Sequence, residues 1–274
     1  MRAGVEKSRN LMTVRIAQEI GLNKITNFSK KLKIYERPEE LMSISLGSAE
    51  TTLLKMTSAY SSFVNGGKLV EPIFIDRIQD SEGKTIFKNQ LRFCKDCDLI
   101  SYTSENLPQI KNNYKQIFSP QTAYQMTSIL EGVVQRGTGK KLKDLKLQLA
   151  GKTGTTNKNT DAWFIGFTSN LVIGVYVGFD NPRTLGKFET GSKTALPIFK
   201  EFVKNSVNNH EARPFKVAKG IKMMVVDAST GKKADSNSKS TIIESFKEEK
   251  IANNYKIDID NISDVSKTNI LKFY

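Results

Sequence analysis

Two stretches in the first quarter of the chain carry apolar residues with helical spacing and end in glycine. Residues 11–20 place an apolar side chain at every third or fourth position before Gly21, and residues 53–64 do the same before Gly66 and Gly67. A repeat of about 3.6 residues is typical of helices that bury one face, and glycine often follows the last helical residue. Both stretches are therefore predicted to be amphipathic helices.

A third long helix is predicted at residues 120–133. Ser119 can cap its first turn and Pro120 occupies the first helical position, where its missing N–H costs nothing. Shorter helices are expected at residues 27–32 and from Pro197 onward.

Apolar runs separated by turn residues predict strands in the second half of the chain. A three-strand antiparallel meander is expected over residues 149–156, 162–167 and 172–179. Further strand pairs are expected at residues 73–79 with 85–87 and at residues 221–227 with 242–247. Helices that pack on an antiparallel sheet indicate an α+β fold.

Composition supports a folded protein with a basic surface. The chain has 274 residues, 38% of them hydrophobic, and 15 are Phe, which is enough for a core. A net charge of +14 favours anionic partners, but no recognised motif accompanies it, so we do not expect nucleic-acid binding. The lysine-rich residues 140–146 are expected to form a solvated loop. No stretch approaches the ~20 apolar residues of a membrane span.

The most informative stretch, residues 149–156, reads LAGKTGTT. Lys152 supplies a fixed positive charge, and the hydroxyls of Thr153 and Thr155 can donate hydrogen bonds to a carboxylate. Gly154 has no Cβ, so a ligand backbone can come close. This combination favours recognition of an acidic peptide end. An ordinary strand with a polar edge explains the same residues.

A second motif, Ser-x-Asn, stands near the start of the chain. Ser8 and Asn10 open the first predicted helix. Ser-x-Asn before a helix and Lys-Thr-Gly on a strand, in that order, are two of the three signatures of the serine penicillin-recognising enzymes. With KSRNLMTVR at residues 7–15 and DAWF at residues 161–164, the chain resembles the transpeptidase domain of class A, bifunctional penicillin-binding proteins of the 1A type. The resemblance covers roughly residues 4 to 247.

The third signature, Ser-x-x-Lys, carries the nucleophile of this family upstream of Ser-x-Asn, where only seven residues precede Ser8. Three literal matches occur elsewhere, with serine and lysine at Ser81 and Lys84, Ser229 and Lys232, and Ser236 and Lys239. They are predicted to lie in hairpin tips or a polar loop, whereas the nucleophile needs a buried helix start. We therefore expect an N-terminally truncated domain, from a truncated or split gene, that has no transpeptidase activity alone.

The resemblance implies a penicillin-binding transpeptidase fold, similar to β-lactamases, with three layers. It implies serine acyl transfer between peptidoglycan stem peptides that end in D-Ala-D-Ala. Ser8 would relay a proton, Asn10 would hold the donor peptide, and Lys152 would support Ser8. The substrate-binding residues implied are Thr153, Gly154, Thr155 and Thr156. No metal or organic cofactor is implied.

The partners implied are stem peptides, β-lactams and an upstream polypeptide that supplies the nucleophile. Members of the family act at the periplasmic face of the bacterial inner membrane and are held there by an N-terminal anchor, which we do not find in these residues. A different hypothesis is a noncatalytic module that binds cell-wall peptides or a partner protein.

The two cysteines, Cys94 and Cys97, are close enough in sequence for a local disulfide in an oxidising compartment, and two ligands alone cannot make a four-ligand zinc site. Redox catalysis is disfavoured because no strand-to-helix junction is predicted there. The single His210 lies in a polar stretch and is expected at the surface.

We expect three parts along the chain: a partial transpeptidase domain at residues 1–213, a short β extension at residues 214–247, and a weakly ordered tail at residues 248–274 rich in charge and Asn.

Overall fold

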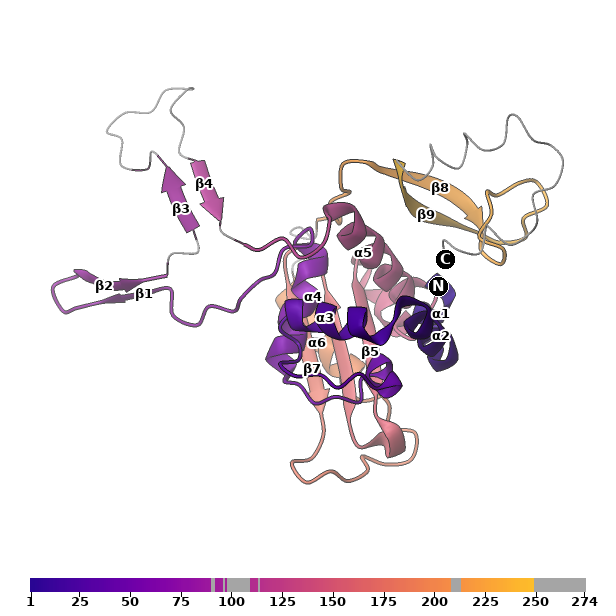
Figure 1. Ribbon diagram of the computed structural model, residues 1–274, viewed down its shortest axis with the longest axis horizontal. Helices are drawn as coiled ribbons and strands as arrows, with labels where there is room; N and C mark the ends of the chain where they lie inside the picture. Colours follow the sequence, from indigo (N-terminus) through magenta and orange to yellow (C-terminus); the bar gives the residue numbers. More distant parts are fainter. Residues whose placement is uncertain (90–91, 96, 98–108, 113, 208–212, 249–274) are drawn as a thin grey trace.

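The computed structural model describes residues 1–89, 92–95, 97, 109–112, 114–207 and 213–248 (Figure 1). Its helices are α1 (Arg2–Glu6), α2 (Asn10–Ile20), α3 (Leu22–Lys31), α4 (Leu53–Val64), α5 (Pro120–Gln135) and α6 (Ala195–Ser206), with short 3-10 helices η1 (Met42–Leu46), η2 (Lys140–Leu145) and η3 (Asn157–Asn159). Its strands are β1 (Arg77–Gln79), β2 (Thr85–Lys88), β3 (Arg92–Lys95), β4 (Gln109–Asn112), β5 (Ala150–Thr155), β6 (Ala162–Phe167), β7 (Val172–Val177), β8 (Ile221–Asp227) and β9 (Thr241–Lys247).

A three-stranded antiparallel sheet, in the order β5-β6-β7, forms the centre of the molecule. Its register places Lys152 opposite Ile165, and Ile165 opposite Gly174. The predicted meander is confirmed, and the strand with Lys-Thr-Gly lies at one edge of this sheet, not in its middle. An edge position leaves one side of the β5 backbone open to a ligand.

Helices cover both faces of the sheet, which gives the three layers that the resemblance implied. On one face, Phe167 packs with Leu130 of α5 and Phe215. On the other face, Phe164 meets Phe199 of α6 edge-on, with 4.8 Å between ring centroids. All of these side chains except Leu130 and Phe215 have no exposed surface, and those two are nearly buried. The fold therefore has one apolar cluster on each face.

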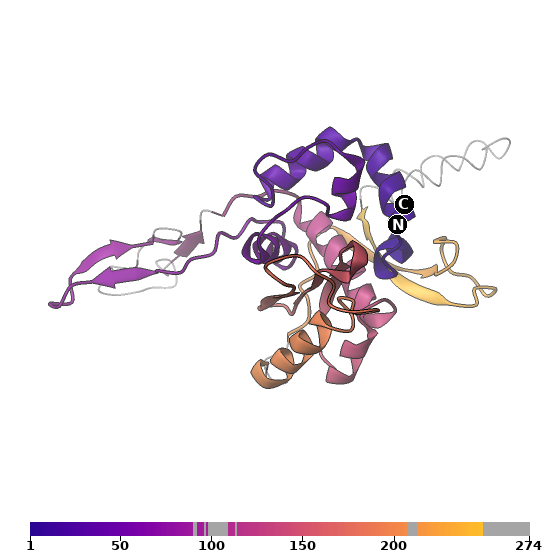
Figure 2. The same ribbon diagram turned by 90° about the horizontal axis from the view of Figure 1, so that it is seen from below.

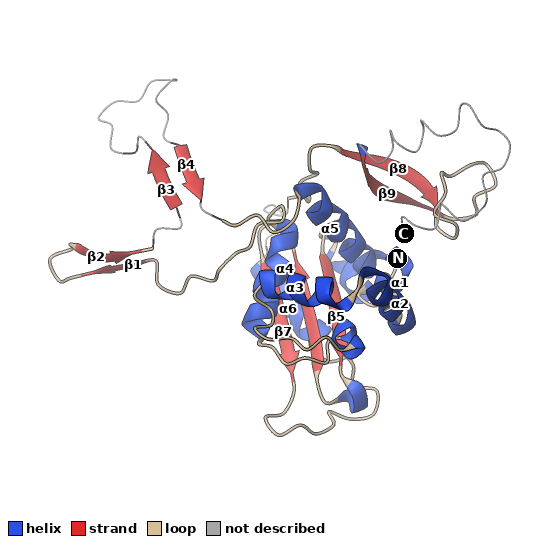
Figure 3. Ribbon diagram, in the orientation of Figure 1, coloured by secondary structure: helices blue, strands red, loops and turns tan. Residues whose placement is uncertain are grey.

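Three pairs of strands extend from this body, two on one side and one on the other. The β1–β2 and β3–β4 hairpins form a long arm that points away from the sheet, as the view from below shows (Figure 2). The β8–β9 hairpin lies near the N-terminal end of the chain and contacts α5 (Figure 3). A disulfide joins Cys94 of β3 to Cys97, which agrees with the local disulfide considered for this pair.

Helix α2 begins at Asn10 and ends at Ile20, just before Gly21, as predicted, whereas two other predicted helix starts were wrong. Helix α3 begins at Leu22 instead of residue 27, because Gly21 with φ 94° serves as the boundary of both helices. Helix α6 begins at Ala195, two residues before Pro197, because proline is tolerated anywhere in the first turn of a helix.

The lysine-rich residues 140–146 were wrongly predicted to be a solvated loop. Lys140–Leu145 form the 3-10 helix η2, and Leu142 is fully buried in the cluster around Phe164. The four lysines of this segment are exposed, while Leu142 and the partly buried Leu145 pack against the core and hold the turn there.

The expected helix cap at Ser119 is confirmed, since its hydroxyl accepts a hydrogen bond from Thr122 N at 3.2 Å. His210 and, except for Glu248, the expected tail at residues 248–274 lie outside the described residues. None of the helices in the described ranges combines the length and the apolar character needed to cross a bilayer.

Candidate functional site

The structure brings Ser8 and Lys152 together although 144 positions separate them in the sequence. Lys152 Nζ donates to Ser8 Oγ, and it donates to the carbonyl oxygen of Thr153 at 3.0 Å. Burial lowers the pKa of Lys152 from 10.5 to about 8, because desolvation penalises its charged form. Lys152 is therefore a hydrogen-bond donor that can change its protonation state near neutral pH.

A tight turn between α1 and α2 holds Ser8. Its backbone is left-handed, with φ 51°, which a residue other than glycine rarely adopts. Ser8 N donates to Val5 O at 3.2 Å, and Arg9 N donates to Gly4 O at 2.8 Å, so the turn is closed by two backbone bonds. Ser8 thus reaches Lys152 from a constrained position.

Asn10 is the first residue of α2 and is exposed. It lies beside Ser8 in a hollow with a volume of about 560 Å³. The other residues that line this hollow are Arg9, Leu11, Met12 and Arg15. Two guanidinium groups next to Ser8 favour a negatively charged ligand.

The threonine hydroxyls after Lys152 have different surroundings. Thr153 Oγ1 lies 2.9 Å from Thr138 Oγ1, and Thr155 Oγ1 accepts a hydrogen bond from Gly191 N at 3.0 Å. Thr156 Oγ1 accepts from Asp161 N at 2.8 Å in the connection from β5 to β6. The Thr156 side chain therefore shapes the turn after β5, while the hydroxyls of Thr153 and Thr155 lie along the strand itself.

Gly154, between these threonines, lies against the next strand. A Cβ added there would meet Trp163 Cβ at 3.1 Å, which is tighter than ordinary contact. This position therefore favours a residue without a side chain for packing alone, before any ligand is considered.

Sequence reasoning missed several polar residues around the site. Thr138, which contacts Thr153, comes just after α5, and the buried Glu6 lies two residues before Ser8. Arg136 donates to both carboxylate oxygens of Glu6, at 2.6 and 3.2 Å. In the sequence, Glu6 is only a glutamate shortly before an apolar helix, and this pattern is too common to indicate a role.

The three Ser-x-x-Lys matches lie where they were predicted. Ser81 is at the tip between β1 and β2, and Ser229 and Ser236 are in the connection from β8 to β9. All three serines are exposed. None of them occupies the buried helix start that a nucleophile of this kind needs.

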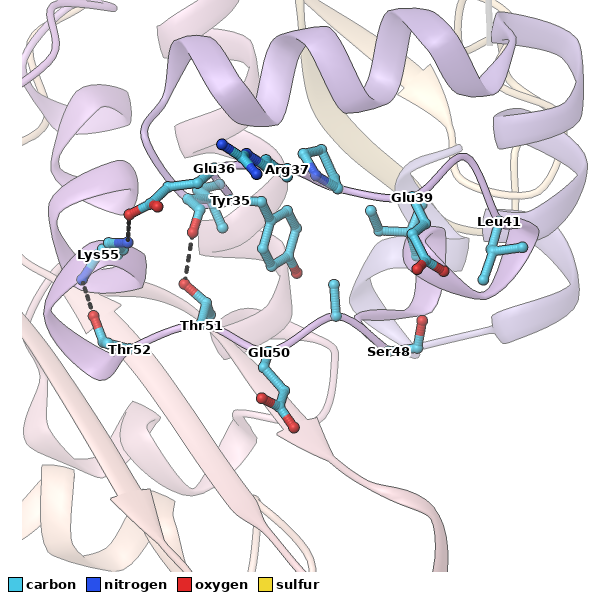
Figure 4. A pocket seen from close by; sticks show the side chains of 14 residues that line it. Tyr35, Glu36, Arg37, Glu39, Leu41, Ser48, Glu50, Thr51, Thr52 and Lys55 are labelled. Carbon is cyan, nitrogen blue, oxygen red and sulfur yellow. Dashed lines mark hydrogen bonds and ion pairs between the residues drawn. The ribbon is translucent and has the colours of Figure 1, made fainter.

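A second hollow, with a volume of about 610 Å³, lies in the connection from α3 to α4 (Figure 4). Lys55 Nζ donates to Glu36 at 2.9 Å, and Thr51 donates to the carbonyl oxygen of Ile34 at 2.8 Å. Neither Ser8 nor Lys152 lines it. Lys55 and Glu36 form an ion pair at its edge, and the hollow shares no lining residue with the one beside Ser8.

No three His, Cys, Asp or Glu side chains of the described residues lie together in a way that could hold a metal ion. The polar groups at the Ser8 turn are the hydroxyl of Ser8, the amine of Lys152, the amide of Asn10 and the guanidinium groups of Arg9 and Arg15.

Comparison with known proteins identifies the family. Residues 1–204 match the model of the penicillin-binding protein transpeptidase domain. The chain belongs to this family. Penicillin-binding protein 1A of Rickettsia prowazekii is 43% identical over 269 residues, which are 96% of this chain and 34% of the relative. Penicillin-binding protein 1A of Pseudomonas aeruginosa is 31% identical over 281 residues, which are 91% of this chain and 34% of the relative. The chain thus spans about a third of the length of these transpeptidase-family relatives.

Solved structures of penicillin-binding proteins agree with this assignment. Penicillin-binding protein 1A from Haemophilus influenzae is 29% identical with a TM-score of 0.75, and the match covers 89% of this chain and 39% of that one. The PonA1 protein from Mycobacterium tuberculosis in complex with penicillin V has a TM-score of 0.61 over 79% of this chain and 58% of that one, and at 19% identity it shows the fold alone.

Proposed function

We propose that this chain forms part of a D-Ala-D-Ala transpeptidase site that cross-links peptidoglycan stem peptides by serine acyl transfer. The observation that carries this proposal is the contact between Lys152 and Ser8, which joins two of the family's three motifs across 144 residues of sequence. Family membership supports the reaction class, and the geometry supports the residues.

In the proposed reaction, a serine nucleophile attacks the carbonyl of the penultimate D-Ala while the lysine of Ser-x-x-Lys takes up its hydroxyl proton. The C–N bond to the terminal D-Ala then breaks, and this D-Ala leaves with a proton that is relayed through Ser8. An amino group of a neighbouring stem peptide then resolves the acyl-enzyme. Lys152 donates to Ser8 Oγ, so the hydroxyl proton of Ser8 points away from Lys152 and can be given to the leaving nitrogen. Ser8 is the proton relay and Lys152 its electrostatic support.

Substrate binding is assigned to the two sides of the Ser8 turn. Asn10 holds the donor peptide, and Thr153 and Thr155 bind its terminal carboxylate, helped by the positive charge of Lys152. Gly154 lets the peptide lie close to β5. The N–H of Thr155 supplies one donor of the oxyanion hole.

The nucleophile comes from a Ser-x-x-Lys segment outside these 274 residues, in the same polypeptide or in a separate one. The three matches inside the chain support this, because their serines are exposed in turns. The chain alone is then inactive, and the complete site is sensitive to β-lactams and faces the periplasm.

Labelling with a fluorescent penicillin, read as a covalent band on a denaturing gel, tests this function. The 274-residue chain alone gives no band, and co-expression with a family Ser-x-x-Lys segment gives one on that segment. Lys152→Ala abolishes the band, whereas Lys200→Ala, which removes an exposed pair with Asp144, keeps it.

A band on the chain alone would place the nucleophile within it and overturn this assignment. Absence of a band after complementation, with retained binding of a D-Ala-D-Ala peptide, would favour a noncatalytic binding module.

A further inference from the structure

Glu6 is a buried carboxylate that the proposed reaction does not use. It ends α1, two residues before Ser8, and is 4% exposed. Arg136 Nη2 and Nε donate to its two oxygens at 2.6 and 3.2 Å, and Arg2 Nη1 approaches it at 3.5 Å. A carboxylate this buried is costly unless it is paired, so its position is fixed by these partners.

Helix α5 is shaped to receive Glu6. A Cβ at Gly132 would lie 1.9 Å from Glu6 Oε1, and a Cβ at Gly137 would lie 2.1 Å from the carbonyl oxygen of Glu6. Thr138 N donates to that same carbonyl at 3.2 Å. The last turn of α5 and the residues directly after it therefore hold both the side chain and the backbone of Glu6.

Glu6 and the segment after α5 that holds it are connected to both Ser8 and the strand that carries Lys152. Ser8 follows Glu6 after a single residue and stands in the left-handed turn. Thr138, bound to the backbone of Glu6, contacts the hydroxyl of Thr153, the neighbour of Lys152. One short chain of hydrogen bonds thus connects the Ser8 turn with strand β5.

We propose that Glu6 is a positioning residue for the Ser8–Lys152 pair, acting through Arg136 and Thr138. It does not reach the reacting atoms. Its carboxylate fixes the end of α1 on α5, and this contact sets the place of the Ser8 turn relative to β5. The inference rests on the proposed function, since it concerns the same site.

The test is an NMR titration of the Lys152 side chain in the 274-residue chain. Glu6→Gln keeps the shape of the side chain and removes the charge that Arg136 and Arg2 bind. The Ser8 turn then loosens and water reaches Lys152, so its titration midpoint rises from about 8 toward 10.5, by about one unit. An unchanged midpoint in a folded Glu6→Gln variant overturns the proposal.

Further variants separate positioning from simple stabilisation. Arg136→Lys keeps a cation beside Glu6 and retains the parent midpoint, whereas Arg136→Met raises it. Thr138→Val removes the hydroxyl contact with Thr153 at nearly constant volume and should also raise the Lys152 midpoint. This variant provides the test if Glu6→Gln does not fold. Glu71→Gln breaks the exposed pair with Lys33 and leaves the midpoint unchanged.

A purely structural role would lower the melting temperature of the Glu6 and Arg136 variants while the Lys152 midpoint stayed at the parent value, and this result would also overturn the proposal. The titration needs neither penicillin nor a nucleophile. Failure of the labelling experiment would therefore contradict the proposed function without affecting this measurement.

Discussion

The hairpins β8–β9 and β1–β2 are both two-stranded and antiparallel, yet they relate differently to the rest of the molecule. In β9, Glu244 pairs with Arg2 of α1, and the carbonyl oxygen of Ser245 accepts from Gln125 of α5 at 2.8 Å. In the β1–β2 hairpin, the described hydrogen bonds are local, such as the one from Gln79 Nε2 to Gly83 O at 2.8 Å.

This difference shows what makes a hairpin part of a domain. An isolated two-stranded hairpin is marginally stable in water, so its packing partners decide its stability. Val226 of β8 is 3% exposed, whereas Ile86 of β2 is 68% exposed. The β8–β9 hairpin should therefore unfold with the main body, and β1–β2 should unfold independently of it.

The largest expected effect compares one phenylalanine near each hairpin. Phe215 leads into β8 and packs against Phe167, with 5.7 Å between ring centroids. Phe215→Ala should lower the free energy of unfolding by about 3–5 kcal/mol in urea titrations, because a large buried side chain is lost. Phe87→Ala in β2, where the ring is half exposed, should cost less than about 0.5 kcal/mol. Equal losses would show that the two hairpins are equally anchored.

The second prediction concerns the ion pair that holds β9. Glu244→Gln leaves the guanidinium of Arg2, which is 9% exposed, without one of its carboxylates. Removing one partner of a buried pair should cost about 3 kcal/mol in the free energy of unfolding. Glu82→Gln, at the exposed tip of β1–β2, serves as the matched control and should be nearly neutral. A neutral Glu244→Gln would mean that β8–β9 is not fixed by this pair.

The smallest expected effect is a pH dependence of the free energy of unfolding that comes from the candidate site and not from the β1–β2 arm. The pKa of Lys152 is about 8 in the folded chain and 10.5 as its ordinary value. Between these values the unfolded chain binds the extra proton, so the free energy of unfolding rises with pH through this window, on the order of 1 kcal/mol for this group after screening.

Denaturant titrations at several pH values should show this rise in the parent chain and in Phe87→Ala, which lies on the arm. Lys152→Met should flatten it. The same slope in Lys152→Met and the parent would place the origin of the rise elsewhere.

The sequence predicted the parts of the fold that local patterns determine. The meander of β5, β6 and β7, the helix after Ser8 and the Ser119 cap follow from periodicity and capping preferences. The predicted start of α3 was wrong because one glycine, Gly21, can end one helix and begin the next. The burial of Leu142 was not predicted because tertiary packing overrides the polarity of its neighbours in sequence.

The candidate site divides in the same way. Ser8 and Lys152 were found through their motifs, and their contact is a result of the fold. Glu6 and Thr138 could not be found, because nothing in the sequence near residue 6 shows that it lies on the end of α5. Such contacts join residues that are far apart in the sequence, and neither partner alone carries a pattern that reveals the contact.

The pair of Arg2 and Glu244 also sets an order of events during synthesis. These residues are 242 positions apart, and the chain leaves the ribosome from its N-terminal side. Arg2 has no carboxylate from β9 until residue 244 has been made, whereas the local β1–β2 hairpin can close long before. The Ser8 turn is therefore translated early, whereas the ion pair that ties the preceding helix α1 to β9 can form only when synthesis is almost complete.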